Sequence, residues 1–317
     1  MHVLIFQGCI ICIRENMLKQ TKNAIQGYMY VFPVVLLLLS LSLYPLVRSF
    51  YLSFHEVKLS SLNSQVFVGF KNYNSIFTRI VPDFYKHILP ATVVYVAGSV
   101  IGQLGFGLAI ALILNQRFIK GKGLIRAFII LPWVTSGIVI AISWRFMFEP
   151  RLGILNYILQ MFGNSNPPTW LNDLKLVRIC LIIANIWHGM AFSFIIQTAG
   201  LQSIPEEVYE AAVVDGANSI QRFRFITMPL IHSFIILNLI LTSMHTVNSF
   251  DLVYAMTNGG PLYKSEVISV YLYHRAFDFG HLGEGSSIAV LILLFNLILT
   301  YFYMKLNKEK PRHKNEN

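Results

Sequence analysis

The chain has 317 residues, of which 55% are hydrophobic and only 13% are charged, and its formal net charge is +10. A soluble globular domain carries about a quarter charged residues, so the composition excludes an ordinary soluble protein and indicates a single membrane domain. The positive charge does not indicate a nucleic-acid partner, because the basic residues lie in short segments between long apolar runs. That pattern orients membrane proteins.

The N-terminal region divides at Met17. Residues 1–16 hold an apolar run that is too short to cross a bilayer and lacks the basic start of a signal peptide. Met17 is followed by a basic lead-in, LKQTKNAIQG, and then by the first long apolar run. We expect residues 1–16 to be an upstream extension, translation to begin at Met17 and the membrane domain to occupy 17–317. A tryptic peptide containing Cys9 in the purified protein would contradict this expectation.

Six apolar runs are long enough to cross a bilayer, which takes about 20 residues. In lipid each is expected to be a helix, because a helix satisfies its own backbone polar groups. The expected fold class is therefore an all-α integral membrane protein with six transmembrane helices. The predicted spans are residues 24–47, 88–114, 125–148, 177–200, 225–250 and 286–304.

The second span carries a row of small residues. Gly98, Gly102 and Gly105 are spaced so that they share one face of a helix. Small residues at this spacing let helix backbones approach closely in lipid. The row predicts a tight helix–helix contact and says nothing about function.

Basic residues are unevenly distributed between the two sides of the predicted bundle. Thirteen lie in the two ends and in the 115–124 and 201–224 loops, whereas nine lie in the three longer loops on the opposite side. The density of positive charge differs more than twofold, and positively charged loops stay in the cytoplasm. We expect a multi-pass protein of a bacterial cytoplasmic membrane with both termini in the cytoplasm.

A polar segment, PEEVYEAAVVDGANSIQRFRFITMPLI, separates the fourth and fifth spans. Ser203 and Glu206 fit a capping-box pattern at the start of a helix that Gly216 ends, and Asn218 or Ser219 can cap a second helix. The pattern predicts a cytoplasmic helix-turn-helix within about residues 201–224. From periodicity alone, an amphipathic loop lying on the membrane surface remains an equal alternative.

The spacing within this segment resembles the EAA loop of the inner-membrane permeases of binding-protein-dependent ABC importers. That motif reads EAA, three residues, Gly, nine residues, Ile, one residue and Leu-Pro, and this chain departs from it only in having Met228 where the motif has Leu. The resemblance implies a loop that docks into a separate ATPase, with small alanines that allow close approach. The residues expected to form this coupling loop are Glu210, Ala211, Ala212, Asp215, Gly216, Ile226 and Pro229.

Two further stretches resemble the maltose and glycerol-phosphate branch of these permeases, which takes up carbohydrates. They are FDLVYAMTNGGPLYKSEVISVYLYHRAF, which follows the fifth span, and LPWVTSGIVIAISWRFMF in the third span. The TNGGP turn is expected either to contact an external binding protein or to shape a re-entrant loop. Together the resemblances cover essentially all of residues 17–308.

The resemblance implies a subunit that is not an enzyme. The sequence contains no GxxxxGK[ST] phosphate-binding loop, so ATP and Mg²⁺ are expected on a separate ATPase, and this chain is expected to bind no cofactor or metal itself. The implied partners are a second, homologous permease, two cytoplasmic ATPase subunits and an extracytoplasmic solute-binding protein, together with membrane lipid.

Polar side chains within the fourth and fifth spans are candidates for the solute pathway, because polar groups in a membrane are costly and tend to be functional. Neutral hydrogen-bonding groups suit an uncharged, polyhydroxylated solute better than an ion. The alternative is that they form interhelical hydrogen bonds, each worth under about 2 kcal/mol. The candidates are Asn185, His188, Asn238, Thr242, His245 and Ser249.

The expected function is therefore that of a permease subunit of an ATP-driven sugar importer. An importer for a glycerol-phosphate-type or other solute is the alternative within the same class. An ion-coupled secondary transporter is the alternative from a different class. Against the latter, the spans show no inverted repeat and no buried carboxylate for ion coupling.

Overall fold

The computed structural model describes residues 29–116, 120–164 and 166–308. The chain divides into two units, residues 1–52 and 53–317. The expected start at Met17 and the extension before it lie outside the described residues. The described part of the first unit is a helix, Met29–Ser53, which is long and apolar enough to cross a membrane. Its middle, η1 (Leu39–Leu43), is π-helical, and its last part is α2 (Tyr44–Ser53).

The second unit begins with a hairpin that the all-α prediction did not include. β1 (His55–Lys58) pairs antiparallel with β2 (Ser61–Phe67). Val57 is buried between exposed neighbours, the alternation of a strand with one covered face. The Asn72 side chain donates to the carbonyls of Ser53 and His55, at 2.9 Å each. The all-α fold class therefore needs this correction, because a short polar hairpin gives no long apolar run.

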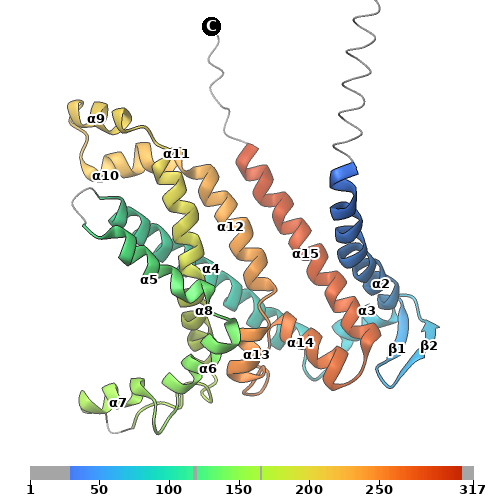
Figure 1. The fold of residues 1–317 in the computed structure, drawn as a ribbon. Helices are drawn as coiled ribbons and strands as arrows, with labels where there is room; N and C mark the ends of the chain where they lie inside the picture. The colour runs from blue at the N-terminus through green and yellow to red at the C-terminus, as the bar shows by residue number, and fades with distance from the viewer. Residues whose placement is uncertain (1–28, 117–119, 165, 309–317) are drawn as a thin grey trace, which may run out of the picture. The chain divides into compact units, whose positions relative to one another are not determined.

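The rest of the second unit is helical (Figure 1). Its longer helices are α4 (Leu89–Asn115), α5 (Lys122–Val134), α6 (Gly137–Met147), α8 (Leu176–Gln202), α12 (His232–Val247) and α15 (Leu282–Lys308). Shorter helical pieces are α3 (Lys71–Thr78), η2 (Phe84–Ile88), α7 (Ile154–Met161), α9 (Glu206–Val214), α10 (Ser219–Arg222), η3 (Phe223–Thr227), α11 (Met228–Leu230), α13 (Asp251–Thr257), α14 (Ile268–Tyr273) and η4 (His274–Asp278).

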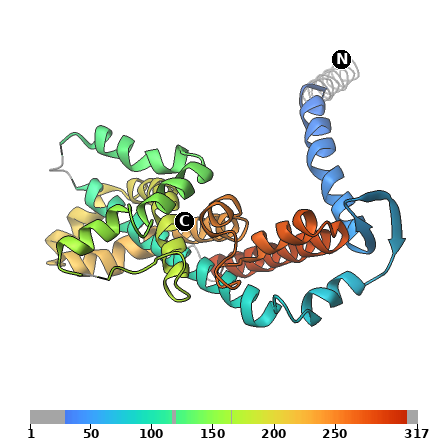
Figure 2. The same ribbon diagram turned by 90° about the horizontal axis from the view of Figure 1, so that it is seen from below.

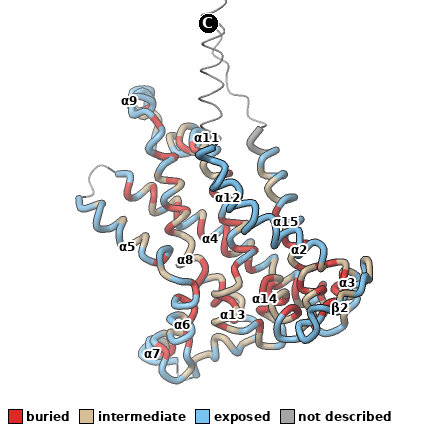
Figure 3. The backbone as a smooth tube through the Cα atoms, turned by 45° about the vertical axis from the view of Figure 1, so that its right-hand side comes forward, coloured by how far each residue is buried: buried red, intermediate tan, exposed pale blue. Residues whose placement is uncertain are grey.

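The helices of the second unit have two distinct ends. The segment from α9 to α11 lies at one end, and α7, α13, α14 and the hairpin lie at the other (Figure 1). α3 and β1 pack on α15, and Figure 2 shows α15 between them and the remaining helices. Buried residues concentrate where α4, α8 and α12 meet and around α13 and α14, whereas α5 and α9 are mostly exposed (Figure 3). The core therefore runs between these two ends.

α4 and α8 pack closely, and small residues of α4 make this possible. A methyl group at Gly98 would lie 2.8 Å from Ile182, and Gly102 leaves no room for one beside Ile186. Gly105 faces open space, whereas Gly107 packs against Ser193 of α8. The predicted small-residue contact thus involves Gly98 and Gly102 and continues through Gly107 instead of Gly105.

Four described helices are long and apolar enough to span a membrane, or up to six if each of two bent helix pairs counts as one span. The prediction of one continuous helix over 125–148 is wrong, because α5 and α6 meet at 96°. Pro132 lacks an amide proton, and Thr135 and Ser136 are both extended, with ψ near 139° and 136°. Gly137 then starts α6 with the carboxylate of Asp251 packed directly against its Cα.

The predicted fifth span, 225–250, is also interrupted. The helical stretch that ends at Leu230 and α12, which begins at His232, meet at 65°. Residues 225–230 therefore belong to the bent segment before α12, and Ser249 and Phe250 lie beyond the end of the helix. Pro229 lies in α11, near the end of this stretch and just before the bend.

Candidate functional site

The segment between α8 and α12 contains two short helices joined by a sharp turn. α9 ends at Val214, and Gly216 follows in the left-handed conformation, with φ of +79°. The amide of Gly216 donates to the carbonyl of Val213 at 3.0 Å, and the amide of Ala217 donates to that of Ala212 at 2.9 Å. This pair of bonds is a Schellman motif, which favours glycine at the left-handed position. We refer to residues 206–230 as the α9–α11 segment.

The second helix begins with a capping box centred on Asn218. Its side chain accepts from the amide of Gln221 at 2.9 Å, and the Gln221 side chain accepts from the amide of Asn218 at 2.8 Å. The capping box expected at Ser203 and Glu206 is wrong. Ser203 ends α8, its hydroxyl donates to a carbonyl of that helix, and Pro205 precedes α9 without a side-chain cap. The link between the helices is too short for Ser203 to serve both.

The α9–α11 segment is fixed to the ends of the long helices. The Tyr209 hydroxyl lies 2.9 Å from the hydroxyl of Thr227, which is almost fully buried. Tyr209 also packs on an apolar cluster that includes Leu114 of α4, Phe194 of α8 and Ile231. A cavity of about 640 Å³ with mixed polar and apolar walls lies between α9, α10 and the ends of α4 and α8. α9 therefore contacts α4, α8 and the start of α12, so a displacement of α9 would be transmitted to these three long helices.

The two alanines of the motif face different ways. Ala211 is exposed, whereas Ala212 is 9% exposed and packs within its own chain. The expectation that both alanines present a bare surface to a partner therefore holds for Ala211 alone. Periodicity placed the two residues on a helix but could not show which side of it the chain covers. Of the other coupling residues, Glu210, Asp215, Gly216 and Pro229 are exposed and Ile226 is half-buried.

Several large apolar side chains on the α9–α11 segment are exposed. Val214 is 87% exposed, Ile220 is 77% exposed and Phe225 is 70% exposed. Exposed apolar side chains on a polar segment are candidates for contact with a protein or with a membrane surface. The sequence motif did not point to these residues.

Four of the six pathway candidates make contacts inside the bundle. The Asn238 side-chain oxygen accepts from Ser193 of α8 at 3.3 Å and from Thr242 at 3.0 Å. The Ser249 hydroxyl accepts from Tyr95 of α4 at 3.3 Å. Asn185 is buried, and its backbone carbonyl accepts from the side chain of a glutamine on α4. The Asn238 and Ser249 side chains thus bond to α8 and α4, whereas the Thr242 bond lies within α12 and Asn185 contributes its backbone carbonyl.

The remaining two candidates lie together. The rings of His188 on α8 and His245 on α12 are 6.3 Å apart and nearly perpendicular. His188 is half-buried and His245 is exposed. Asp251 packs against Gly137 at the break between α5 and α6. Within the described residues no group of three His, Cys, Asp or Glu side chains is placed to hold a metal ion.

The turn after α13 is held by its own hydrogen bonds. The Ser265 hydroxyl donates to the carbonyl of Gly260 at 2.5 Å and lies 2.8 Å from the Thr257 hydroxyl. His274 lies 3.0 Å from Glu266 through one ring nitrogen and 3.0 Å from Asn258 through the other. The hydrogen bond from Glu266 raises the pKa of His274, against the opposing effect of burial. This network fixes the conformation of the turn from within the chain.

Comparison with known proteins extends this description. "Trehalose/maltose transport system permease protein MalF" of Thermococcus litoralis is 32% identical over 287 residues, covering 90% of this chain and 95% of that protein. "Sulfoquinovosyl glycerol transport system permease protein SmoG" of Agrobacterium fabrum is 33% identical over 283 residues, covering 88% of this chain and 89% of the other.

The fold also matches a solved structure, described as a bacterial ABC transporter involved in the import of the acidic polysaccharide alginate. The TM-score is 0.79 at 21% identity, covering 94% of this chain and all of the other. A family model described as "Binding-protein-dependent transport system inner membrane component" matches residues 103–310. The chain therefore belongs to the family of inner membrane components of binding-protein-dependent transport systems.

Proposed function

We propose that this chain is the membrane-spanning permease subunit of an ATP-driven importer that moves a sugar or sugar-like solute into the cytoplasm. The observation that carries the proposal is the α9–α11 segment, which joins an exposed apolar surface to the ends of three long helices. Relatives named for trehalose/maltose and sulfoquinovosyl glycerol transport support a sugar-like solute. This architecture suits a protein moved by a partner that binds and hydrolyses ATP.

The proposed arrangement has six spans with both termini in the cytoplasm. Four helices together with the two bent pairs supply six crossings. The α9–α11 segment lies at the same end of the second unit as the last turns of α15 (Figure 1). In the sequence, the segments expected on the side of this loop carry the denser positive charge, which favours the cytoplasmic side. The α9–α11 segment is accordingly a cytoplasmic helix-turn-helix.

The α9–α11 segment is the proposed docking site for a separate ATPase. Glu210, Ala211 and Asp215 lie on its exposed surface, next to Val214. Ala212, Gly216, Ile226 and Pro229 shape the segment and do not themselves form most of that surface. The proposed assembly contains two ATPase subunits, a second homologous permease and an extracytoplasmic solute-binding protein. ATP and Mg²⁺ bind the ATPase chains.

Substitution of the exposed alanine tests the docking proposal. Ala211→Trp adds bulk outside the chain, so the ATPase is expected to copurify poorly while the permease inserts and folds normally. Ala211→Ser is the matched control and is expected to retain the ATPase. Ala212→Trp is less informative, because Ala212 is covered by its own chain and the change would disturb folding as well. Full ATPase copurification and uptake with Ala211→Trp would contradict docking at this surface.

The proposed solute route passes beside His188 and His245, the two candidates whose rings meet between α8 and α12. Asn238 and Ser249 join neighbouring helices through their side chains, and Asn185 and Thr242 are further candidates beside this route. Neutral polar groups favour an uncharged solute, and a phosphate-bearing solute is the alternative within this class. The similar fold of a transporter that imports an acidic polysaccharide means that the fold alone does not decide the charge of the solute.

Uptake into proteoliposomes tests the function. The permease is reconstituted with its copurifying subunits and binding protein, and radiolabelled maltose, trehalose and glycerol 3-phosphate are supplied in turn with ATP inside. Uptake that requires ATP and is blocked by vanadate is expected. Asp251, a half-buried carboxylate at the break between α5 and α6, is the observation that favours an ion-coupled transporter instead. Uptake driven by a proton or sodium gradient without ATP would establish that alternative.

A further inference from the structure

α7 is apolar on two opposite sides. Its sequence, ILNYILQM, contains no charged residue. On one side Leu155 packs on the core cluster that includes Cys180 and Leu181 of α8. The other side is exposed within the described part of the chain and is formed by residues at spacings of three and four, Ile154, Tyr157, Ile158 and Met161. A helix that is apolar on both sides is stable when both are covered, so we expect a partner outside the chain on the exposed side.

The depth of α7 is fixed by its attachment to the first turns of α8. The Asn156 side chain accepts from the indole of Trp170 at 2.6 Å and donates to the carbonyls of Pro150 and Pro168 at 3.0 Å and 3.2 Å. Trp170 packs on the cluster that includes Cys180 of α8. α8 has 27 residues and is about 40 Å long, whereas the hydrocarbon core of a bilayer is about 30 Å thick. When α8 is centred in the bilayer, its first turn lies among the headgroups and Cys180 lies at the edge of the hydrocarbon. α7 therefore lies at the boundary between the headgroups and the lipid chains.

The exposed side of α7 continues onto α6. One hollow joins the two, and it is lined by Ile142, Ser143, Phe146, Met147, Leu152 and Ile154. In the proposed six-span arrangement α5 and α6 form one crossing, so the exposed apolar side of α6 faces the interior of the membrane. Figure 1 shows α7 extending sideways beyond α6 at this end of the second unit. The apolar surface therefore runs from the side of a span onto α7.

The charges beside this surface distinguish a lipid from a soluble protein. Arg145 and Arg151 are exposed and, together with Glu149, line a second hollow next to it. Arginines at headgroup depth contact lipid phosphates while their methylene stems lie on apolar surface. An interface with a soluble protein carries about one hydrogen bond per 100–200 Å², whereas the exposed side of α7 offers only the hydroxyl of Tyr157. This layout, an apolar helix face flanked by basic residues, is typical of a helix that lies in a membrane surface.

We propose that the exposed side of α7 lies in the outer leaflet of the membrane. Ile158 and Met161 contact acyl chains, and the guanidinium groups of Arg145 and Arg151 contact lipid phosphates. α7 thereby holds the start of α8 at a fixed depth, because Asn156 joins it to the segment that leads into α8. The other end of α8 leads into α9, so a displacement of α9 acts on a helix that the lipid surface anchors at its far end. This contact is independent of the transported solute.

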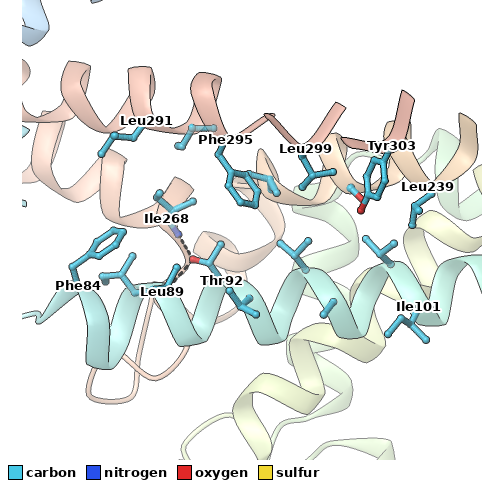
Figure 4. A pocket seen from close by; sticks show the side chains of 18 of the residues that line it. Phe84, Leu89, Thr92, Ile101, Leu239, Ile268, Leu291, Phe295, Leu299 and Tyr303 are labelled. Carbon is cyan, nitrogen blue, oxygen red and sulfur yellow. Dashed lines mark hydrogen bonds between the residues drawn. The ribbon is translucent and has the colours of Figure 1, made fainter. Parts of the chain in front are cut away.

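Spin-label accessibility tests the proposal. Ile158→Cys places a nitroxide on the exposed apolar side of α7, and Gln160→Cys places one at an exposed position off that side. Ile101→Cys, on the exposed surface near the middle of α4, gives the value for the membrane interior (Figure 4). The native cysteines are replaced by serine, and the permease, with the subunits that copurify, is placed in phosphatidylethanolamine–phosphatidylglycerol vesicles. Collisions with a polar nickel chelate are expected to be about tenfold rarer at Ile158→Cys than at Gln160→Cys, because the chelate does not enter lipid, while collisions with oxygen stay frequent.

A second measurement identifies the molecule that covers α7. A photo-crosslinking amino acid at Met161 is expected to add the mass of one phospholipid to the permease. Equally frequent chelate collisions at Ile158→Cys and Gln160→Cys would place α7 in water and overturn the proposal. A label at Ile158→Cys that both oxygen and chelate fail to reach would also overturn it, because a protein would then cover this side. So would a crosslink from Met161 to a second permease or to the binding protein instead of lipid.

Discussion

The turn at Gly216 gives the sharpest prediction about the α9–α11 segment. Gly216 has φ of +79°, and a Cβ added there would have no atom within 4 Å. Substitution therefore creates no clash, and its cost is that of holding an L-residue in the left-handed region, about 1–2 kcal/mol. Asn tolerates this region better than Val does, so Gly216→Asn is expected to cost less than Gly216→Val. A cost of this size changes a local opening equilibrium about 5- to 30-fold.

Hydrogen exchange at the amide of Ala217 measures that change directly, because this amide donates to the carbonyl of Ala212 across the turn. Exchange is expected to accelerate about 5- to 30-fold in Gly216→Val and less in Gly216→Asn. Copurification of the ATPase is expected to fall in the same order. Gly123→Ala is the matched control, since Gly123 also has open space around it but lies within α5 without a positive φ. Unchanged exchange in Gly216→Val would refute the reasoning.

Three further changes test other contacts. Tyr209→Phe removes the hydroxyl contact with Thr227 and is expected to loosen α9 by about 1 kcal/mol, seen as faster hydrogen exchange in α9; unaltered exchange would contradict this anchoring role. Asn238→Ala removes the acceptor of two hydroxyls and is expected to lower the thermal midpoint in detergent by an amount equivalent to about 1 kcal/mol, and an unchanged midpoint would argue against a packing role. Because the hydrogen bond with Glu266 raises the folded pKa of His274, its stabilisation is complete below the unfolded pKa of about 6.5 and is lost as pH rises through the folded value. The thermal midpoint should fall over that range in the wild type and fall less in Glu266→Gln; equal slopes would contradict the assignment.

The long spans were readable from the sequence because their physical signal is local. α4 and α8 begin and end within one or two residues of the predicted spans 88–114 and 177–200. An apolar run in lipid has no alternative to a helix, so composition and length suffice. The turn at Gly216 and the two helices that flank it were also predictable from the sequence, because the turn and the cap that follows it depend only on neighbouring residues.

Features that depend on distant residues were missed. Pro132 alone does not end a helix in a membrane, and the 96° bend after α5 accompanies the packing of Asp251 against Gly137, which is more than a hundred residues away in the chain. The burial of Ala212 likewise depends on how α9 rests on the ends of other helices. Asn238 was recognisable in the sequence as a polar residue within a span, but its partner Ser193 on α8 became visible only in the fold.

The meeting of His188 and His245 shows the same limit of local patterns. They lie in different spans, and nothing in the sequence indicates how α8 and α12 align with each other. The structure brings their rings to 6.3 Å. The resemblance to known permeases pointed to the correct family from motif spacing, whereas the exposure of Val214 and Ile220, at variable positions within the motif, emerged only from burial.

The central claim is that a separate ATPase binds the α9–α11 segment. A photo-crosslinking amino acid placed at Val214, which is 87% exposed on α9, tests it in intact cells. The same amino acid at Leu152, which is 79% exposed between α6 and α7 at the opposite end of the second unit, is the control. The account predicts a crosslink from Val214 to an ATPase subunit and none from Leu152. Crosslinking from Leu152 but not from Val214 would contradict it.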